Sequence, residues 1–89
     1  MKKQELLIEN KLGLHARAAA QIVKTSSMYA SKITLVRDKL EVDGKSIMGI
    51  MLLDAPKGSV MMVMVDGPDE ETALNGLEIL FKNKFGEKE

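Results

Sequence analysis

The sequence predicts a two-layer α+β domain, in which a four-stranded antiparallel or mixed sheet carries three helices on one face. Segments with strand and helix character alternate in the order β-α-β-β-α-β-α. The 89 residues leave room for one sheet and one layer of helices, and therefore for a single domain over residues 1–89. The two middle strands are separated by a tight turn, which pairs them as a hairpin.

The first half of the chain is predicted to contain a strand, a helix and a second strand. Residues 4–9 form a β-prone run between charged residues, and residues 10–13 form a loop. From Ala16, apolar residues recur at helical spacing as far as residues 26–27, where serine hydroxyls compete for backbone hydrogen bonds. Residues 32–37 are rich in β-branched side chains, which predicts the second strand.

The second half continues with a hairpin, a short helix and a central strand. Residues 38–39 connect the second strand to a third strand over residues 40–42. Ser46 suits a helix N-cap, because its hydroxyl can accept a free amide of the first turn. The apolar run over residues 47–53 contains a glycine, so the helix is predicted to be short. Residues 60–65 are continuously apolar, which favours a central strand, although the periodicity alone also allows a buried helix.

The final helix is predicted to begin at the acidic residues 69–71, because the positive end of the helix dipole favours negative charge. Gly86 is expected to stop this helix, and residues 87–89 are expected to fray. Its apolar stripe comprises Ala73, Leu74, Leu77, Phe81 and Phe85.

Composition excludes several classes of function. The 13 basic and 13 acidic residues cancel, so no net field attracts nucleic acid or an anionic membrane. The absence of cysteine removes disulfides, thiolate catalysis and zinc–thiolate sites. No stretch approaches the ~18 apolar residues of a membrane span, and the N-terminal segment has no signal-peptide core. We therefore expect a cytoplasmic protein without membrane insertion or direct contact with nucleic acid.

The strongest candidate for a functional site is the segment Gly13-Leu14-His15-Ala16-Arg17. His15 is the only histidine, and it lies where a helix is predicted to start. Amides at a helix start are unpaired, so an anion attached to the ring would be stabilised there. The same field favours neutral imidazole, whose lone pair a nucleophile needs. The residues alone also allow an ordinary surface histidine.

Arg17 strengthens the interpretation of this segment as a phosphoryl site, because a guanidinium is a planar, permanently charged donor to phosphoryl oxygens. Metal binding is disfavoured, since no second histidine and no cysteine is present. No P-loop pattern occurs, so the sequence shows no means of binding ATP and implies no cofactor. A phosphoryl group on His15 would have to come from another protein.

Two segments resemble the histidine-containing phosphocarrier family, HPr, of the bacterial phosphoenolpyruvate-dependent phosphotransferase system. The segment around His15 resembles the active-site motif of that family, and residues 45–51 resemble its regulatory serine segment. The spacing between the motifs, the length and the order of elements also match, so the resemblance covers nearly the whole chain. It implies an open-faced β-sandwich with a four-stranded antiparallel sheet.

The resemblance also implies a function. His15 would accept phosphate on Nδ1 from enzyme I, which phosphoenolpyruvate charges, and pass it to IIA acceptor proteins for sugar uptake. Arg17 would contact the phosphoryl group, and the backbone amides of Ala16 and Arg17 would bind it. The chain would then be a monomeric phosphocarrier that forms a phosphohistidine as a substrate of phosphotransferases, and not an enzyme.

The same resemblance assigns regulation and docking. Ser46 would be phosphorylated by HPr kinase/phosphorylase, with a transcriptional regulator as a further partner, and this is compatible with its role as an N-cap. An exposed apolar surface next to His15 would bind the partners, because methionine adapts to several surfaces. The docking residues would be Ala20, Lys24, Ile47, Met48 and Met51.

Two positions depart from the family pattern, and both concern the tuning of His15. Leu12 stands where many members have a small polar residue, and Ala18 stands where many have proline. Two alternative functions stay open. One is a regulatory binding module of a nitrogen-branch or kinase-linked phosphotransferase system. The other is an α+β binding domain with an incidental histidine.

Overall fold

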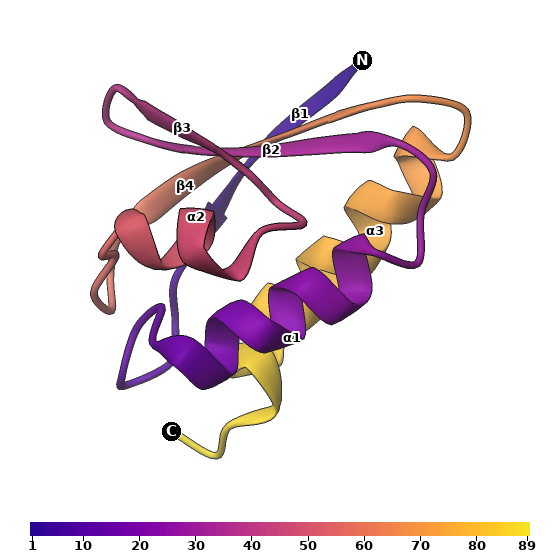
Figure 1. Cartoon of the computed structure of the whole chain (residues 1–89). Helices are drawn as coiled ribbons and strands as arrows, with labels where there is room; N and C mark the ends of the chain where they lie inside the picture. The colour runs from indigo at the N-terminus through magenta and orange to yellow at the C-terminus, as the bar shows by residue number, and fades with distance from the viewer.

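Four strands and three α-helices make up the computed structural model, which describes residues 1–89 (Figure 1). The strands are β1 (Lys2–Leu7), β2 (Lys32–Arg37), β3 (Leu40–Asp43) and β4 (Val60–Asp66). The helices are α1 (Ala16–Ser26), α2 (Ile47–Leu52) and α3 (Glu70–Lys82), followed by the 3-10 turn η1 (Lys84–Gly86). The predicted order of elements is therefore confirmed.

The strands form one sheet in the order β1-β4-β2-β3, and every neighbouring pair is antiparallel. The β4 strand lies between β1 and β2, as its continuous apolar sequence predicts. The helices all lie on one side of this sheet, with α1 and α3 side by side beneath it (Figure 1). This arrangement confirms the two-layer α+β fold with an open sheet face.

The core lies between the sheet and the helices. Alternate residues of β4 point into it, so Met61, Val63 and Val65 are buried whereas Met62 and Met64 are only half-buried. From α1, the small side chains of Ala18 and Ala19 are fully buried together with the larger Ile22. The close neighbours of this helix are α2, α3 and the turn η1, which together hold it under the sheet.

Two predicted boundaries differ from the structure. The first strand is Lys2–Leu7 rather than residues 4–9, because β4 continues to Asp66 and offers partners for the whole of Lys2–Leu7. The last helix ends at Lys82 rather than continuing through Phe85. The backbone turns into the left-handed region at Lys84 and Phe85, with φ of 56° and 58°. Phe85 is buried as predicted, but it reaches the core through this turn and not through a helical stripe.

None of the three helices combines the length and apolar content that a membrane-crossing segment needs.

Candidate functional site

The loop before α1 is held in one position by a glycine. Gly13 has a φ of +71°, and a Cβ at this residue would lie 2.5 Å from the backbone oxygen of Ala55. The next residue, Leu14, is buried and donates its backbone N–H to the same Ala55 oxygen at 2.9 Å. The loop therefore packs against the segment after α2, and this contact fixes where His15 enters the helix.

His15 is the N-cap residue of α1, as the sequence predicts. Its backbone is extended, with φ of −84° and ψ of 179°, and its Nδ1 accepts the backbone N–H of Arg17 at 3.3 Å. An imidazole thus takes the place that a serine or aspartate oxygen usually occupies. Because Nδ1 accepts this hydrogen bond, it carries a lone pair, which is the property that a nucleophile requires.

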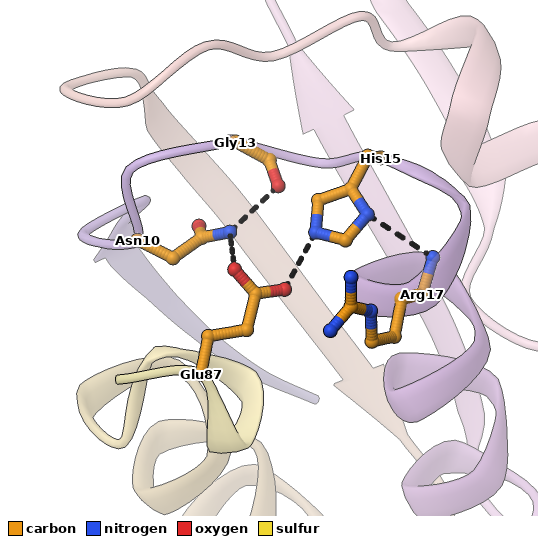
Figure 2. A network of polar contacts seen from close by, with 5 residues as sticks. All are labelled: Asn10, Gly13, His15, Arg17 and Glu87. Atoms are coloured by element: carbon orange, nitrogen blue, oxygen red, sulfur yellow. Dashed lines mark hydrogen bonds and ion pairs between the residues drawn. The ribbon is translucent and has the colours of Figure 1, made fainter. Parts of the chain in front are cut away.

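The other ring nitrogen of His15 contacts a carboxylate from the far end of the chain. Nε2 lies 2.5 Å from Oε2 of Glu87, and Oε1 of Glu87 accepts a hydrogen bond of 2.9 Å from the side-chain amide of Asn10 (Figure 2). The prediction that residues 87–89 fray is therefore wrong, and Glu87 and Asn10 are site residues that the sequence interpretation missed. No local pattern signals them, because Glu87 and His15 are 72 positions apart.

Arg17 adds positive charge to this cluster. Its guanidinium lies on the same side of the helix start as the His15 ring and the Glu87 carboxylate, and no ion pair occupies it (Figure 2). Burial raises the pKa of Glu87, but the hydrogen bonds from Asn10 and His15 and the charge of Arg17 outweigh burial and hold that pKa below its usual value. At neutral pH the cluster therefore contains an ionised carboxylate and an arginine available to an anion.

A groove of about 770 Å³ opens beside this cluster, between α1 and the C-terminal segment. Basic, acidic and apolar side chains all contribute to its walls. The lining residues are Lys11, Leu12, Arg17, Gln21, Leu80, Asn83, Phe85, Gly86, Glu87, Lys88 and Glu89. His15 exposes 26% of its side chain, so the ring is accessible to solvent while both of its nitrogens have a polar partner.

Residues 2–83 match the family model described as the PTS HPr component phosphorylation site. The chain belongs to the HPr family. The phosphocarrier protein HPr of Xylella fastidiosa (strain 9a5c) is 52% identical over 87 residues, which cover 98% of each chain. The crystal structure of HPr-C-His from Thermoanaerobacter tengcongensis is 45% identical, has a TM-score of 0.95 and covers 100% of both chains. A crystal structure of an HPr dimer from the same organism has a TM-score of 0.78, with 46% identity, and covers 98% of this chain and 100% of its own.

Membership of the HPr family makes the protein a phosphocarrier of the phosphotransferase system, and not a catalyst. The matched segment contains His15, Arg17 and Ser46. It ends before Glu87, so the carboxylate that contacts His15 lies outside the part of the chain that the HPr family model describes.

The residues predicted for docking in this HPr chain lie on two neighbouring helices. Ala20 and Lys24 are exposed on α1, which packs against α2. Ile47, Met48 and Met51 are exposed on α2, and Met48 exposes 79% of its surface. Ser46, the N-cap of α2, accepts the backbone N–H of Gly49 at 3.1 Å and is half-exposed at the edge of the same surface.

The two departures from the family pattern have different surroundings. Leu12 is exposed and lines the groove, whereas Ala18 is fully buried in the first turn of α1. Leu52 is a further exposed apolar residue of α2 that the sequence interpretation did not include.

Proposed function

We propose that this protein works in the cytoplasm, where it accepts a phosphoryl group on Nδ1 of His15 from phosphorylated enzyme I. It then passes this group to IIA proteins for sugar uptake. The observation that carries the proposal is the orientation of the imidazole. Nδ1 faces the N-terminus of α1, where it accepts the N–H of Arg17. A phosphoryl group on this atom would therefore form beside the unpaired amides and the positive end of a helix dipole.

The residues of the first turn would stabilise the phosphorylated state. When Nδ1 forms its bond to phosphorus, the N–H of Arg17 loses its acceptor on the ring and becomes free to bind a phosphoryl oxygen. The N–H of Ala16 lies in the same turn and has no partner within the helix. The guanidinium of Arg17 supplies further donors and a permanent charge, which suits the planar recognition of phosphoryl oxygens.

Transfer between proteins requires an accessible ring and a surface for docking. The exposed residues Ala20, Lys24, Ile47, Met48 and Met51 provide this surface in our proposal. Both enzyme I and a IIA protein would bind it in turn, which adaptable methionine side chains favour. In this proposal a monomer suffices, because one chain supplies both the ring and the docking residues.

The test is phosphorylation by purified enzyme I and phosphoenolpyruvate. We expect an acid-labile, base-stable phosphate on His15, which mass spectrometry localises and phosphorus NMR assigns to Nδ1. The His15→Ala variant serves as the control and should stay unmodified. Phosphorylation of His15→Ala, or an unmodified wild type, would disprove the proposal. Discharge by sugar-type rather than nitrogen-type IIA proteins distinguishes sugar uptake from the regulatory alternative.

Ser46 is proposed as a second, regulatory phosphorylation site. A phosphate at an N-cap is electrostatically tolerated, and here it would place negative charge next to the exposed Ile47 and Met48. It would therefore weaken docking rather than unfold the helix. HPr kinase/phosphorylase with ATP should modify the wild type but not Ser46→Ala, and the modified protein should receive phosphate from enzyme I more slowly. Equal rates would remove this role.

A further inference from the structure

Both oxygens of the Glu87 carboxylate make polar contacts, and each oxygen has a different partner. Oε2 contacts Nε2 of His15 at 2.5 Å, and Oε1 accepts from Nδ2 of Asn10 at 2.9 Å. The second hydrogen of that amide is donated to the backbone oxygen of Gly13 at 2.8 Å. Asn10 is completely buried, so its amide is a fixed support for the carboxylate. Glu87 itself exposes only 11% of its side chain.

The backbone brings Glu87 to this position through an unusual turn. Lys84 and Phe85 both have left-handed φ values, which are uncommon for residues with a side chain. The turn is anchored by Phe85, which is buried and packs edge-to-face on Phe81 with ring centroids 4.9 Å apart. Beyond it, the backbone oxygen of Glu89 accepts the N–H of Lys11. The contact with His15 is therefore supported on both sides along the chain.

These contacts select one form of the imidazole. An ionised carboxylate can only accept hydrogen bonds, so the proton of the neutral ring lies on Nε2. The lone pair then lies on Nδ1, in agreement with the hydrogen bond that Nδ1 accepts from Arg17. Glu87 and the helix N-terminus therefore act on opposite nitrogens and favour the same tautomer.

The carboxylate also acts on the charge that transfer creates. In the proposed reaction, the Nδ1 lone pair forms the bond to phosphorus while the bond between phosphorus and the nitrogen of the donor phosphohistidine breaks. The electron pair of the broken bond leaves with the donor. The ring of His15, which keeps its Nε2 proton, gains positive charge in this step. An anion at 2.5 Å from Nε2 stabilises that charge at the moment it appears.

We propose that Glu87 is a positioning residue for phosphoryl transfer, which holds His15 with Nδ1 toward the start of α1 and stabilises the positive charge that the ring acquires. This inference rests on the proposed function, because it takes His15 as the acceptor. It extends the site beyond residues 2–83, which match the family model.

The test compares Glu87→Gln with Glu89→Gln. Glutamine has nearly the same shape as glutamate, but it is neutral and carries an NH2 donor in place of one oxygen, so it cannot offer separate acceptor oxygens to Asn10 and His15. Glu89 is the matched control, because its carboxylate pairs with Lys11 and is 73% exposed. With enzyme I and phosphoenolpyruvate, Glu87→Gln should be phosphorylated about tenfold more slowly, which corresponds to about 1.4 kcal/mol. Glu89→Gln should react at the wild-type rate.

A second measurement uses the free proteins and needs no phosphotransferase. Proton–nitrogen NMR of the His15 ring should show a protonated Nε2 with a strongly downfield proton in the wild type and in Glu89→Gln. In Glu87→Gln this proton should move upfield and exchange faster with water. Glu87→Asp retains the charge on a side chain one methylene shorter, and should give intermediate values in both measurements. It takes the place of Glu87→Gln if that variant does not fold.

The outcomes separate the two proposals. An unmodified wild type would disprove the proposed function, whereas the ring spectrum would still report whether Glu87 orients His15. A wild type that is phosphorylated at the same rate as Glu87→Gln would overturn the role of Glu87 and leave His15 as the acceptor. Identical ring spectra of wild type and Glu87→Gln would show that Glu87 does not orient the His15 ring, and would overturn the positioning role.

Discussion

The Nδ1 atom of His15 accepts the backbone N–H of Arg17 at 3.3 Å, so the imidazole is the side-chain cap of α1. Phosphorylation of this atom must break the hydrogen bond, and a phosphoryl oxygen then takes over the amide. The same nitrogen therefore contributes to folding in the free protein and would bear the phosphate in the charged one.

This dual role predicts that two variants of His15 differ in stability but not in activity. Asparagine is a good N-cap and alanine is a poor one, so His15→Asn should be more stable than His15→Ala by about 1 kcal/mol. Both variants lose the contact with Glu87 and the nucleophile, so neither should be phosphorylated. Urea unfolding monitored by circular dichroism checks the difference, and equal midpoints would contradict the capping role.

Arg17 is predicted to affect transfer more than folding. It is exposed on the first turn of α1, so Arg17→Ala should change the free energy of unfolding by no more than about 0.5 kcal/mol. Loss of its contacts to the phosphoryl oxygens should slow phosphorylation by about tenfold or more. Arg17→Lys keeps the charge but not the planar fork, and should recover only part of the rate. Rapid-quench kinetics measures this, and unchanged rates would remove Arg17 from the mechanism.

The lowered pKa of Glu87 predicts a pH-dependent contribution to stability. Because the pKa in the folded state lies below its usual 4.5, the unfolded chain takes up the proton first as the pH falls. The stabilisation by Glu87 is thus complete above about pH 4.5 and is lost as the pH falls through the lower folded-state pKa. At neutral pH, the free energy of unfolding of the wild type should exceed that of Glu87→Gln by about 1–3 kcal/mol.

Urea unfolding of the two proteins between neutral and acidic pH checks this prediction. The difference in the free energy of unfolding should shrink only in the acidic range. A difference that is the same at all pH values would show that the carboxylate charge contributes nothing.

Gly13 is predicted to tolerate no side chain, because a Cβ there would clash with the backbone of Ala55; Gly58 provides the comparison. Gly58 also has a positive φ, of +93°, but a Cβ there meets nothing within 4 Å. Gly58→Ala should therefore cost only the backbone strain, about 1 kcal/mol. Gly13→Ala adds a clash with the Ala55 oxygen, so it should be clearly less stable and should displace His15. The rate of phosphorylation should fall for Gly13→Ala alone. Equal effects of both substitutions on stability and rate would contradict this prediction.

Met48 offers a direct test of the docking surface. It exposes 79% of its surface on α2, whereas Met28, just past the far end of α1, exposes 71%. Met48→Glu should raise the KM of enzyme I for this protein about tenfold, because it places a charge in an apolar contact. Met28→Glu should leave the KM unchanged, and both variants should keep wild-type stability. A similar KM for all three proteins would exclude Met48 from the interface.

The sheet, the helices and the place of His15 could be predicted from sequence because their signals are local. Strand alternation, the Ser46 cap and the glycine before His15 each depend on a few neighbouring residues. Glu87 could not be predicted. Its contact with His15 depends on two consecutive left-handed residues that are not glycine, and on a buried amide 77 positions away. The left-handed turn and the position of the buried amide both depend on tertiary packing, so no short sequence pattern indicates them.

The distance along the chain between His15 and Glu87 also has a consequence during protein synthesis. The ribosome makes His15 72 residues before Glu87, so the imidazole emerges long before its carboxylate partner. A nascent or prematurely terminated chain that lacks residues 84–87 contains His15 and Arg17, but it cannot complete the contact at Nε2. Fully competent acceptors would therefore be restricted to chains that have been translated past Glu87 and have folded their last segment.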